Sequence, residues 1–155
     1  MKHRNLLSVS GLFLFVSLAT GSDESKTGGT LTGNQMDAYA SEYIADHGVL
    51  EPGEQIRVYY DVTLMLDSSE FAMVTDQRVV YWKNGSDTSM ELIMIETMDV
   101  HEEGLIGTVI DIRSLDGTPM RIEIAPMNGG DLFASELESA WYAASPEMPL
   151  PGLPH

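Results

Sequence analysis

Short apolar stretches separated by turn residues fill the chain between Gln55 and Ala125, and one amphipathic stretch follows them. Short runs in which apolar and polar residues alternate, bounded by Gly, Asn, Asp and Ser, predict antiparallel strands. Strands that come together in one part of a sequence, with a helix after them, are typical of a sheet that packs against that helix. The chain is therefore expected to be mainly β, with flanking helices.

Six strands are expected, over residues 55–66, 71–74, 79–82, 88–95, 105–113 and 120–125. Residues 55–66 alternate throughout and predict one long strand with one solvent-exposed face. Residues 92–95 are apolar on both faces, which indicates central burial. Asn84-Gly85 is typical of a two-residue hairpin, because such a turn needs a positive φ at both positions, and Leu115-Asp116-Gly117 predicts another tight turn.

Helical periodicity predicts two helices outside this region. The first runs from about Gln35 to His47, with Asn34 as its cap and Gly48 at its end. Its apolar face is formed by Met36, Tyr39, Ala40, Tyr43 and Ile44. The second helix follows Asp131, which is placed to cap it. Its buried face is expected to hold Phe133, Leu137, Ala140, Trp141 and Ala144.

Residues 1–21 have the features of a secretory signal peptide. The basic run Met1-Lys2-His3-Arg4 precedes an apolar stretch over residues 6–19, and Ala19-Thr20-Gly21 offers small residues for cleavage. The apolar stretch is shorter than the roughly 20 residues that a membrane span needs. We therefore expect an exported protein, periplasmic or extracellular. An uncleaved anchor in the inner membrane is the alternative, and it is the one case in which a membrane contact is expected.

The rest of the chain is expected to form one domain with extensions. Residues 22–33 are small and polar and predict a flexible linker, followed by the helix over 34–48 and a domain over 49–145. Residues 146–155 contain four prolines and predict a mobile tail. The chain has no cysteine, so its stability depends on packing without disulfides.

The charge of the chain excludes several kinds of partner. After residue 21 there are 24 acidic side chains and six basic ones, a net charge of −18. Nucleic acids and anionic lipid head groups bind cationic surfaces, so neither is expected as a partner. The acidic residues are dispersed and are interpreted as a solvated surface. An acidic envelope protein tuned by calcium or salt is an alternative.

Two strings resemble the bacterial pleckstrin-homology-like (PH-like) domains. They are Leu50-Glu51-Pro52-Gly53-Glu54-Gln55-Ile56 and the segment 71–82, which contains Thr75, two polar residues and Arg78 before an apolar run. The resemblance covers about residues 50–144. It implies a strongly bent antiparallel barrel or sandwich with a C-terminal helix as its cap. The family has seven strands, so a further strand is expected within residues 97–103 or from a break in the strand over 55–66.

The sequence offers no specific catalytic or metal-binding motif, and we expect no enzyme activity, metal or cofactor. His101-Glu102-Glu103 lacks further ligands at useful spacing and is interpreted as a polar loop. Residues 111–117 lack the alternating ligands of a calcium loop and are interpreted as a hairpin. Paired carboxylates leave a small hydrolase or a sugar-binding protein as an alternative, which requires a deep pocket with two carboxyl groups of unlike pKa.

Recognition of a protein or peptide is the expected function. The candidate binding residues are Arg57, Tyr59, Met65, Tyr81 and Trp82. If Tyr59 and Met65 lie on an exposed strand face, they form an apolar patch beside Arg57 that is typical of an interface. Alternatively, the helix over 34–48 covers this face. An exposed sheet edge is a second means of binding an extended peptide.

Overall fold

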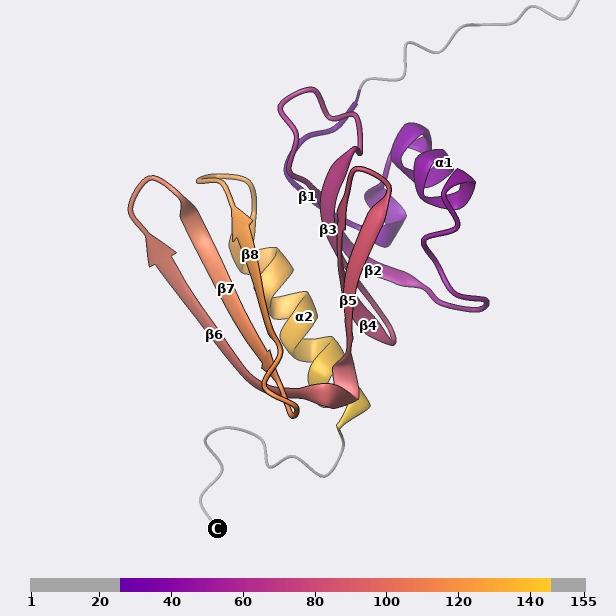
Figure 1. The fold of residues 1–155 in the computed structure, drawn as a ribbon. Coiled ribbons are helices and arrows are strands. Elements are labelled where there is room, and N and C mark those ends of the chain that lie inside the picture. Colours follow the sequence, from indigo (N-terminus) through magenta and orange to yellow (C-terminus); the bar gives the residue numbers. More distant parts are fainter. Residues whose placement is uncertain (1–25, 146–155) are drawn as a thin grey trace, which may run out of the picture.

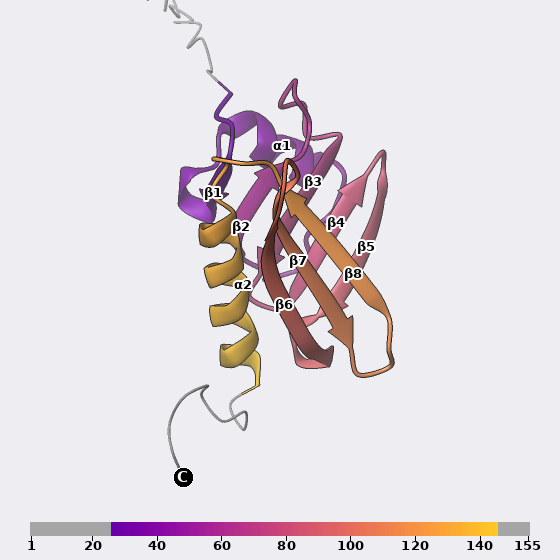
Figure 2. The same cartoon turned by 90° about the vertical axis from the view of Figure 1, so that its left-hand side faces the viewer.

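Two antiparallel sheets, a C-terminal helix and a short N-terminal helix make up residues 26–145, which are the residues that the computed structural model describes. The fold is mainly β, as expected, and the two sheets are not closed into a barrel (Figure 1). The sheets lean together at one end and diverge toward the other. The long C-terminal helix lies between them in Figure 1, and the side view shows it running along one side of both sheets (Figure 2).

The larger sheet has five strands in sequence order. They are β1 (Thr30–Thr32), β2 (Ile56–Asp61), β3 (Glu70–Thr75), β4 (Arg78–Lys83) and β5 (Ser86–Glu91). A 3-10 turn, η1 (Gly33–Gln35), and helix α1 (Ala38–Asp46) separate β1 from β2. The expected hairpin is confirmed, because Asn84 and Gly85 both have positive φ, 50° and 84°, and join β4 to β5.

The smaller sheet consists of three strands, followed by the second helix. They are β6 (Ile95–Glu103), β7 (Gly107–Ser114) and β8 (Pro119–Ile124). Helix α2 (Gly130–Ala144) follows. The predicted hairpin at 115–117 is confirmed as the turn between β7 and β8. A further strand was expected within 97–103 or in a break of the first strand, and β6 occupies the first of these positions.

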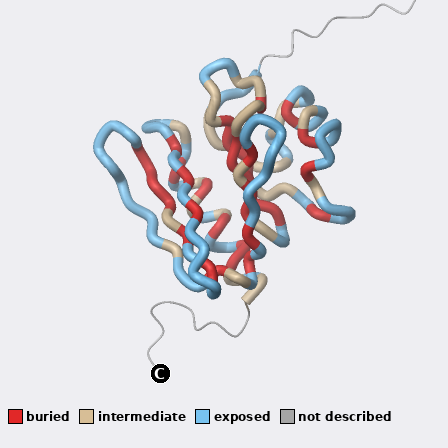
Figure 3. Tube along the Cα trace, in the orientation of Figure 1, coloured by how far each residue is buried: buried red, intermediate tan, exposed pale blue. Residues whose placement is uncertain are grey.

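The main core fills the space between the sheets and α2. Every strand from β2 to β8 contributes apolar side chains to it, and α2 contributes Phe133, Leu137, Ala140 and Trp141. These four helix residues are buried, as their spacing predicts, whereas Ala144, also expected on this face, is only partly buried. The indole N–H of Trp141 also donates a hydrogen bond of 3.2 Å to the carbonyl of Ile95 at the start of β6. The clustered side chains therefore pack the interior. Buried positions, red in Figure 3, are concentrated where the two sheets and α2 face one another.

A second, smaller core lies on the opposite face of the five-stranded sheet. Helix α1 covers this face, with Ala40 and Ile44 packed against the central strands. The side chains below are Tyr59, Phe71, Met73, Val80 and Trp82, with Val49 at the margin. Both faces of β2, β3 and β4 are thus buried, and the prediction of a solvent-exposed face along residues 55–66 is wrong.

The expected long strand over residues 55–66 ends at Asp61. The buried Asp61 carboxylate accepts hydrogen bonds from the main-chain N–H groups of Thr63 and Ser68, both at 2.8 Å. These bonds fold residues 62–69 into a loop. Leu64 and Met65 lie in that loop, where they are 101% and 76% exposed. The alternation of apolar and polar residues therefore extends past Asp61, although the hydrogen bonds of the Asp61 carboxylate end the strand there.

Residues 88–95, which were expected to form one strand, are divided between two. Residues Leu92–Met94 form a 3-10 turn, η2, that takes the chain from β5 into β6 and so from one sheet to the other. Leu92 in this turn and Ile95 after it are buried, whereas Ile93 is 57% exposed. The prediction of central burial for residues 92–95 is therefore only half right.

Both helix caps differ from the prediction. Asp37, not Asn34, caps α1, because its carboxylate accepts a 2.8 Å hydrogen bond from the N–H of Ala40. At α2 the cap is Gly129, with φ of 80°, and Asp131 lies in the first turn. A Cβ on Gly130 would lie 2.0 Å from Thr108 Oγ1, so close packing against β7 selects glycine there.

Part of the predicted linker over 22–33 is ordered in the sheet. Residues 30–32 form β1, which pairs antiparallel with β2. The predicted signal peptide (1–21) and proline-rich tail (146–155) lie outside the described residues. Among residues 26–145, no helix has the length and apolar character needed to cross a membrane.

Candidate functional site

The five candidate binding residues predicted from the sequence do not come together in one site. Tyr59 and Trp82 lie under α1 and are 2% and 6% exposed, so the alternative in which the N-terminal helix covers this face holds for them. The Tyr59 hydroxyl donates a 3.0 Å hydrogen bond to Ser68 Oγ, and burial raises the pKa of Tyr59. The indole N–H of Trp82 is buried without a hydrogen-bond partner among the described residues.

The other three candidates lie on separate surfaces. Arg57 reaches across to α2, where its guanidinium forms a 3.2 Å ion pair with Glu136. Tyr81 lies half-buried on the opposite face of the sheet from Trp82 and donates a hydrogen bond to Glu70. Burial, followed by that hydrogen bond, raises the pKa of Tyr81. Met65 lies at the exposed tip of the loop between β2 and β3.

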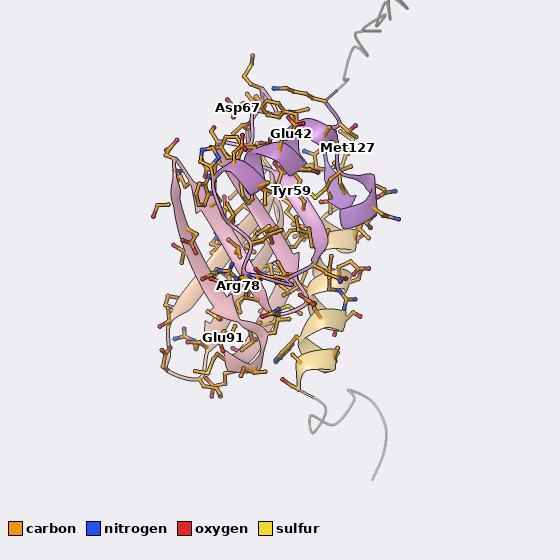
Figure 4. The ribbon with its side chains drawn as sticks, turned by 90° about the vertical axis from the view of Figure 1, so that its right-hand side faces the viewer. Glu42, Tyr59, Asp67, Arg78, Glu91 and Met127 are labelled. Atoms are coloured by element: carbon orange, nitrogen blue, oxygen red, sulfur yellow. The ribbon has the colours of Figure 1, made fainter. Side chains whose placement is uncertain are left out.

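The residues that carry the PH-like resemblance form a buried polar network. The Arg78 guanidinium donates two hydrogen bonds to the Glu54 carboxylate, at 2.9 and 3.0 Å. The Thr75 hydroxyl donates a third bond to the same carboxylate at 2.6 Å. Arg78 also donates to the carbonyl of Val49 at 2.7 Å. These hydrogen bonds hold residues 49–54 against the turn between β3 and β4. Figure 4 shows Arg78 below α1.

The charges of this network stabilise each other. Burial would raise the pKa of Glu54, but the hydrogen bonds from Arg78 and Thr75 and the charge of Arg78 outweigh it, and the pKa lies below its ordinary value. The same pair raises the pKa of Arg78. Both groups are therefore ionised over a wide pH range, and the Glu54 side chain is fully buried. We interpret this pair as structural, since its hydrogen-bonding groups are already used within the protein.

A cleft of about 690 Å³ opens beside Arg78. Its lining combines the β3–β4 turn, the end of β5, η2 and the last residue of α2: Glu51, Asp76, Gln77, Arg78, Ser89, Glu91, Ile93 and Ala144. Three of these side chains are carboxylates. The one cation is Arg78, whose charge is already paired with Glu54. The cleft is therefore suited to a cationic group rather than an anion.

A second cleft of about 360 Å³ lies on the other side of β5. It is lined by Ser89, Met90, Glu91, Met94, Ser114, Asp116 and Thr118. Met90 and Met94 supply apolar surface, while Ser114 and Thr118 lie at the β7–β8 turn. The two clefts share Ser89 and Glu91, so the C-terminal half of β5 is the ridge between them.

The outer edge of β5 is free within the described part of the chain. Among residues 26–145, β5 pairs with β4 alone. Lys83 and Ser86 flank the two-residue turn and form a hydrogen-bonded pair, and such pairs alternate along an antiparallel ladder. The main-chain groups of Asp87, Ser89 and Glu91 therefore point away from β4, toward the free edge.

The outer face of the three-stranded sheet carries charge but brings no metal-binding set together. His101-Glu102-Glu103 lies within β6, so its interpretation as a loop is wrong. Neighbouring strand residues face opposite sides, and Glu102 accepts a hydrogen bond from Thr108 while His101 contacts Asp99. Within residues 26–145 no group of three His, Cys, Asp or Glu side chains could hold a metal ion.

Sequence reasoning missed the two clefts because their walls come from distant segments. Glu51, Arg78, Glu91 and Ala144 meet only after both sheets and α2 have packed. The one available indication was the polar character of Ser86–Glu91 after the Asn84-Gly85 turn, which is typical of a strand with an exposed edge. No model of a known protein family matches the chain, and no curated protein matches it.

Proposed function

We propose that the protein is an exported, non-enzymatic module that binds an extended peptide along the free edge of β5. The observation that carries the proposal is the position of this edge, between two clefts that share Ser89 and Glu91. A peptide that pairs with β5 would direct alternate side chains to the two faces of the sheet. One set would enter the cleft beside Arg78 and the other the cleft beside Met90.

The linings of the clefts support a peptide of alternating cationic and apolar residues. Glu51, Asp76 and Glu91 give the larger cleft an excess of negative charge, which favours lysine or arginine. Met90 and Met94 favour an apolar side chain in the smaller cleft. The net charge of −18 after residue 21 attracts a basic peptide over the whole surface.

The overall architecture supports a PH-like module. Seven strands, β2 to β8, precede α2, and seven is the number that the resemblance implies. They divide into β2–β5 in one sheet and β6–β8 in the other, with the C-terminal helix against both. The space between the sheets is packed, which favours binding at an edge over chemistry in an enclosed chamber. A scaffold of this kind carries many functions, so the proposal depends on the edge and its clefts.

A labelled heptapeptide of alternating lysine and leucine tests the proposal by fluorescence anisotropy. Ser89→Pro removes an N–H that points to the free edge and leaves the β4–β5 hydrogen bonds in place. Ser89→Ala keeps that N–H and is the matched control. We expect Ser89→Pro to weaken binding at least about tenfold, which corresponds to about 1.4 kcal/mol, and Ser89→Ala to bind like the wild type.

A second peptide tests the proposed preference of the larger cleft for cationic side chains. A glutamate–leucine peptide of the same length should bind much more weakly than the lysine–leucine peptide, because it would bring carboxylates to Glu51 and Glu91. Glu91→Gln should reduce the difference between the two peptides. If Ser89→Pro binds the lysine–leucine peptide as tightly as Ser89→Ala does, while both variants melt at the wild-type temperature, edge pairing at β5 is refuted.

A further inference from the structure

Three loops at one end of the molecule carry fully exposed apolar side chains. They are residues 62–69 between β2 and β3, residues 104–106 between β6 and β7, and residues 125–129 between β8 and α2. The most exposed side chains are Leu64 at 101%, Leu105 at 98% and Met127 at 102%, with Met65 at 76% and Ile106 at 38%. We call this surface the apolar end.

Contacts between the loops place them on the same side of the fold. A Cβ on Gly107, the first residue of β7, would lie 2.7 Å from the nitrogen of Pro126, so the second loop ends beside the third. The N–H of Thr30 donates a 2.8 Å hydrogen bond to the carbonyl of Asn128. Gly28 lies beside the side chain of Leu66 in the first loop. In Figure 4, Asp67 and Met127 mark this end, and Glu91 lies toward the other.

The composition of the three loops differs from the rest of the surface. The three loops contain no cation and a single acidic residue, Asp67, although the chain contains 24 acidic residues. Met127 also has φ of 66°, a conformation that is unfavourable for a bulky residue. Its side chain is fully exposed, so no packing within the described residues compensates for this conformation.

The chain enters the described structure at this same end. Lys26 lies 4.0 Å above the ring of Tyr39, and Tyr39 donates a hydrogen bond to the carbonyl of Asp67 in the first loop. The apolar stretch over 6–19 stops seven residues before Lys26. An extended chain covers at most about 3.6 Å per residue, so an N-terminal segment that is not cleaved would anchor the chain within about 25 Å of Lys26.

We infer that the apolar end rests on a lipid bilayer, with Leu64, Leu105 and Met127 inserted among neutral head groups. Apolar loop tips gain by leaving water for the membrane interface. The loops lack the cations that anionic lipids attract, and the acidic chain is repelled by them, so the surface fits zwitterionic lipid. The free edge of β5 stays accessible, because Ser89 and Glu91 lie toward the end that faces away from the bilayer.

Single cysteine variants test this inference, because the chain has no cysteine of its own. Leu64→Cys, Leu105→Cys and Met127→Cys each receive a polarity-sensitive fluorophore, and Leu115→Cys is the matched control at the opposite end. The labelled full-length proteins are mixed with phosphatidylcholine vesicles. We expect a blue shift and a loss of emission to lipid-attached quenchers at the three tips, and neither effect at position 115.

Each contrary result is informative. If the protein floats with the vesicles while the tip labels keep their emission in water, the N-terminal stretch alone holds it and the inference is overturned. A blue shift without vesicles that grows with protein concentration would assign the tips to a second copy of the chain, and a larger shift with phosphatidylglycerol would contradict the preference for neutral lipid.

Discussion

Replacing Glu54 with glutamine removes the negative charge from the buried end of the Glu54–Arg78 pair and keeps the shape of the side chain. The Glu54 side chain is 0% exposed and that of Arg78 is 13% exposed. Breaking a buried ion pair typically destabilises a protein by about 3–5 kcal/mol, because the remaining charge is left without compensation. Water reaches part of the guanidinium, so we expect about 3 kcal/mol for Glu54→Gln.

A double-mutant cycle separates the pair from its surroundings. Arg78→Met leaves the Glu54 carboxylate buried without its cation and should also cost about 3 kcal/mol. The double variant buries neither charge, so its loss should be close to that of either single variant, a coupling of about 2–3 kcal/mol. Urea unfolding followed by tryptophan fluorescence measures all four free energies. Losses that simply add in the double variant would refute the reasoning.

The pH dependence gives a second readout of the same carboxylate. The pKa of Glu54 in the folded protein lies below its ordinary value of 4.5. Its contribution to stability is therefore complete above about pH 5 and is lost as the pH falls through the folded pKa. The difference in unfolding free energy between the wild type and Glu54→Gln should be constant from about pH 5 to 8 and shrink in acid. A difference that grows on acidification would contradict the assignment.

Two further comparisons test the packing. Gly107 has φ of 101° and a Cβ there would lie 2.3 Å from the carbonyl oxygen of Ile124, whereas Gly117 has φ of 87° and open space around it. Gly107→Ala should therefore lower the melting temperature far more than Gly117→Ala, which costs only about 1 kcal/mol of strain; equal shifts in calorimetry would contradict this. Leu137→Ala should cost about 3 kcal/mol in urea unfolding because Leu137 is fully buried between the sheets, and a loss below about 1 kcal/mol would argue against a packed core.

Local patterns were enough to predict most of the fold. Alternation and turn residues identified the strands around Thr75 and Asn84, and the helical spacing from Phe133 to Trp141 identified the buried face of α2. These features depend on residues close in sequence, where the period of the side chains decides which face is apolar. The same reasoning failed where a tertiary contact decided the outcome, as on the face of β2 that α1 covers.

The candidate site could not be predicted from the sequence, for a different physical reason. The sequence pattern of an apolar strand residue is the same whether a helix of the same chain or another molecule covers it. Tyr59 and Trp82 were therefore equally consistent with a core and with an interface. The short strand β1 has no apolar alternation to identify it and forms because β2 offers an edge. The clefts beside β5 depend on the angle between the two sheets, and no pattern among residues close in sequence predicts that angle.

Hydrogen exchange at the main chain of β5 tests the proposed binding edge most directly. In the free protein, the amides of Ser89 and Glu91 should exchange fast because they point to the free edge, while those of Thr88 and Met90 are protected by β4. Addition of the lysine–leucine peptide should slow Ser89 and Glu91 and leave Thr88 and Met90 unchanged. Unchanged exchange at Ser89 and Glu91 with bound peptide would show that the peptide lies elsewhere.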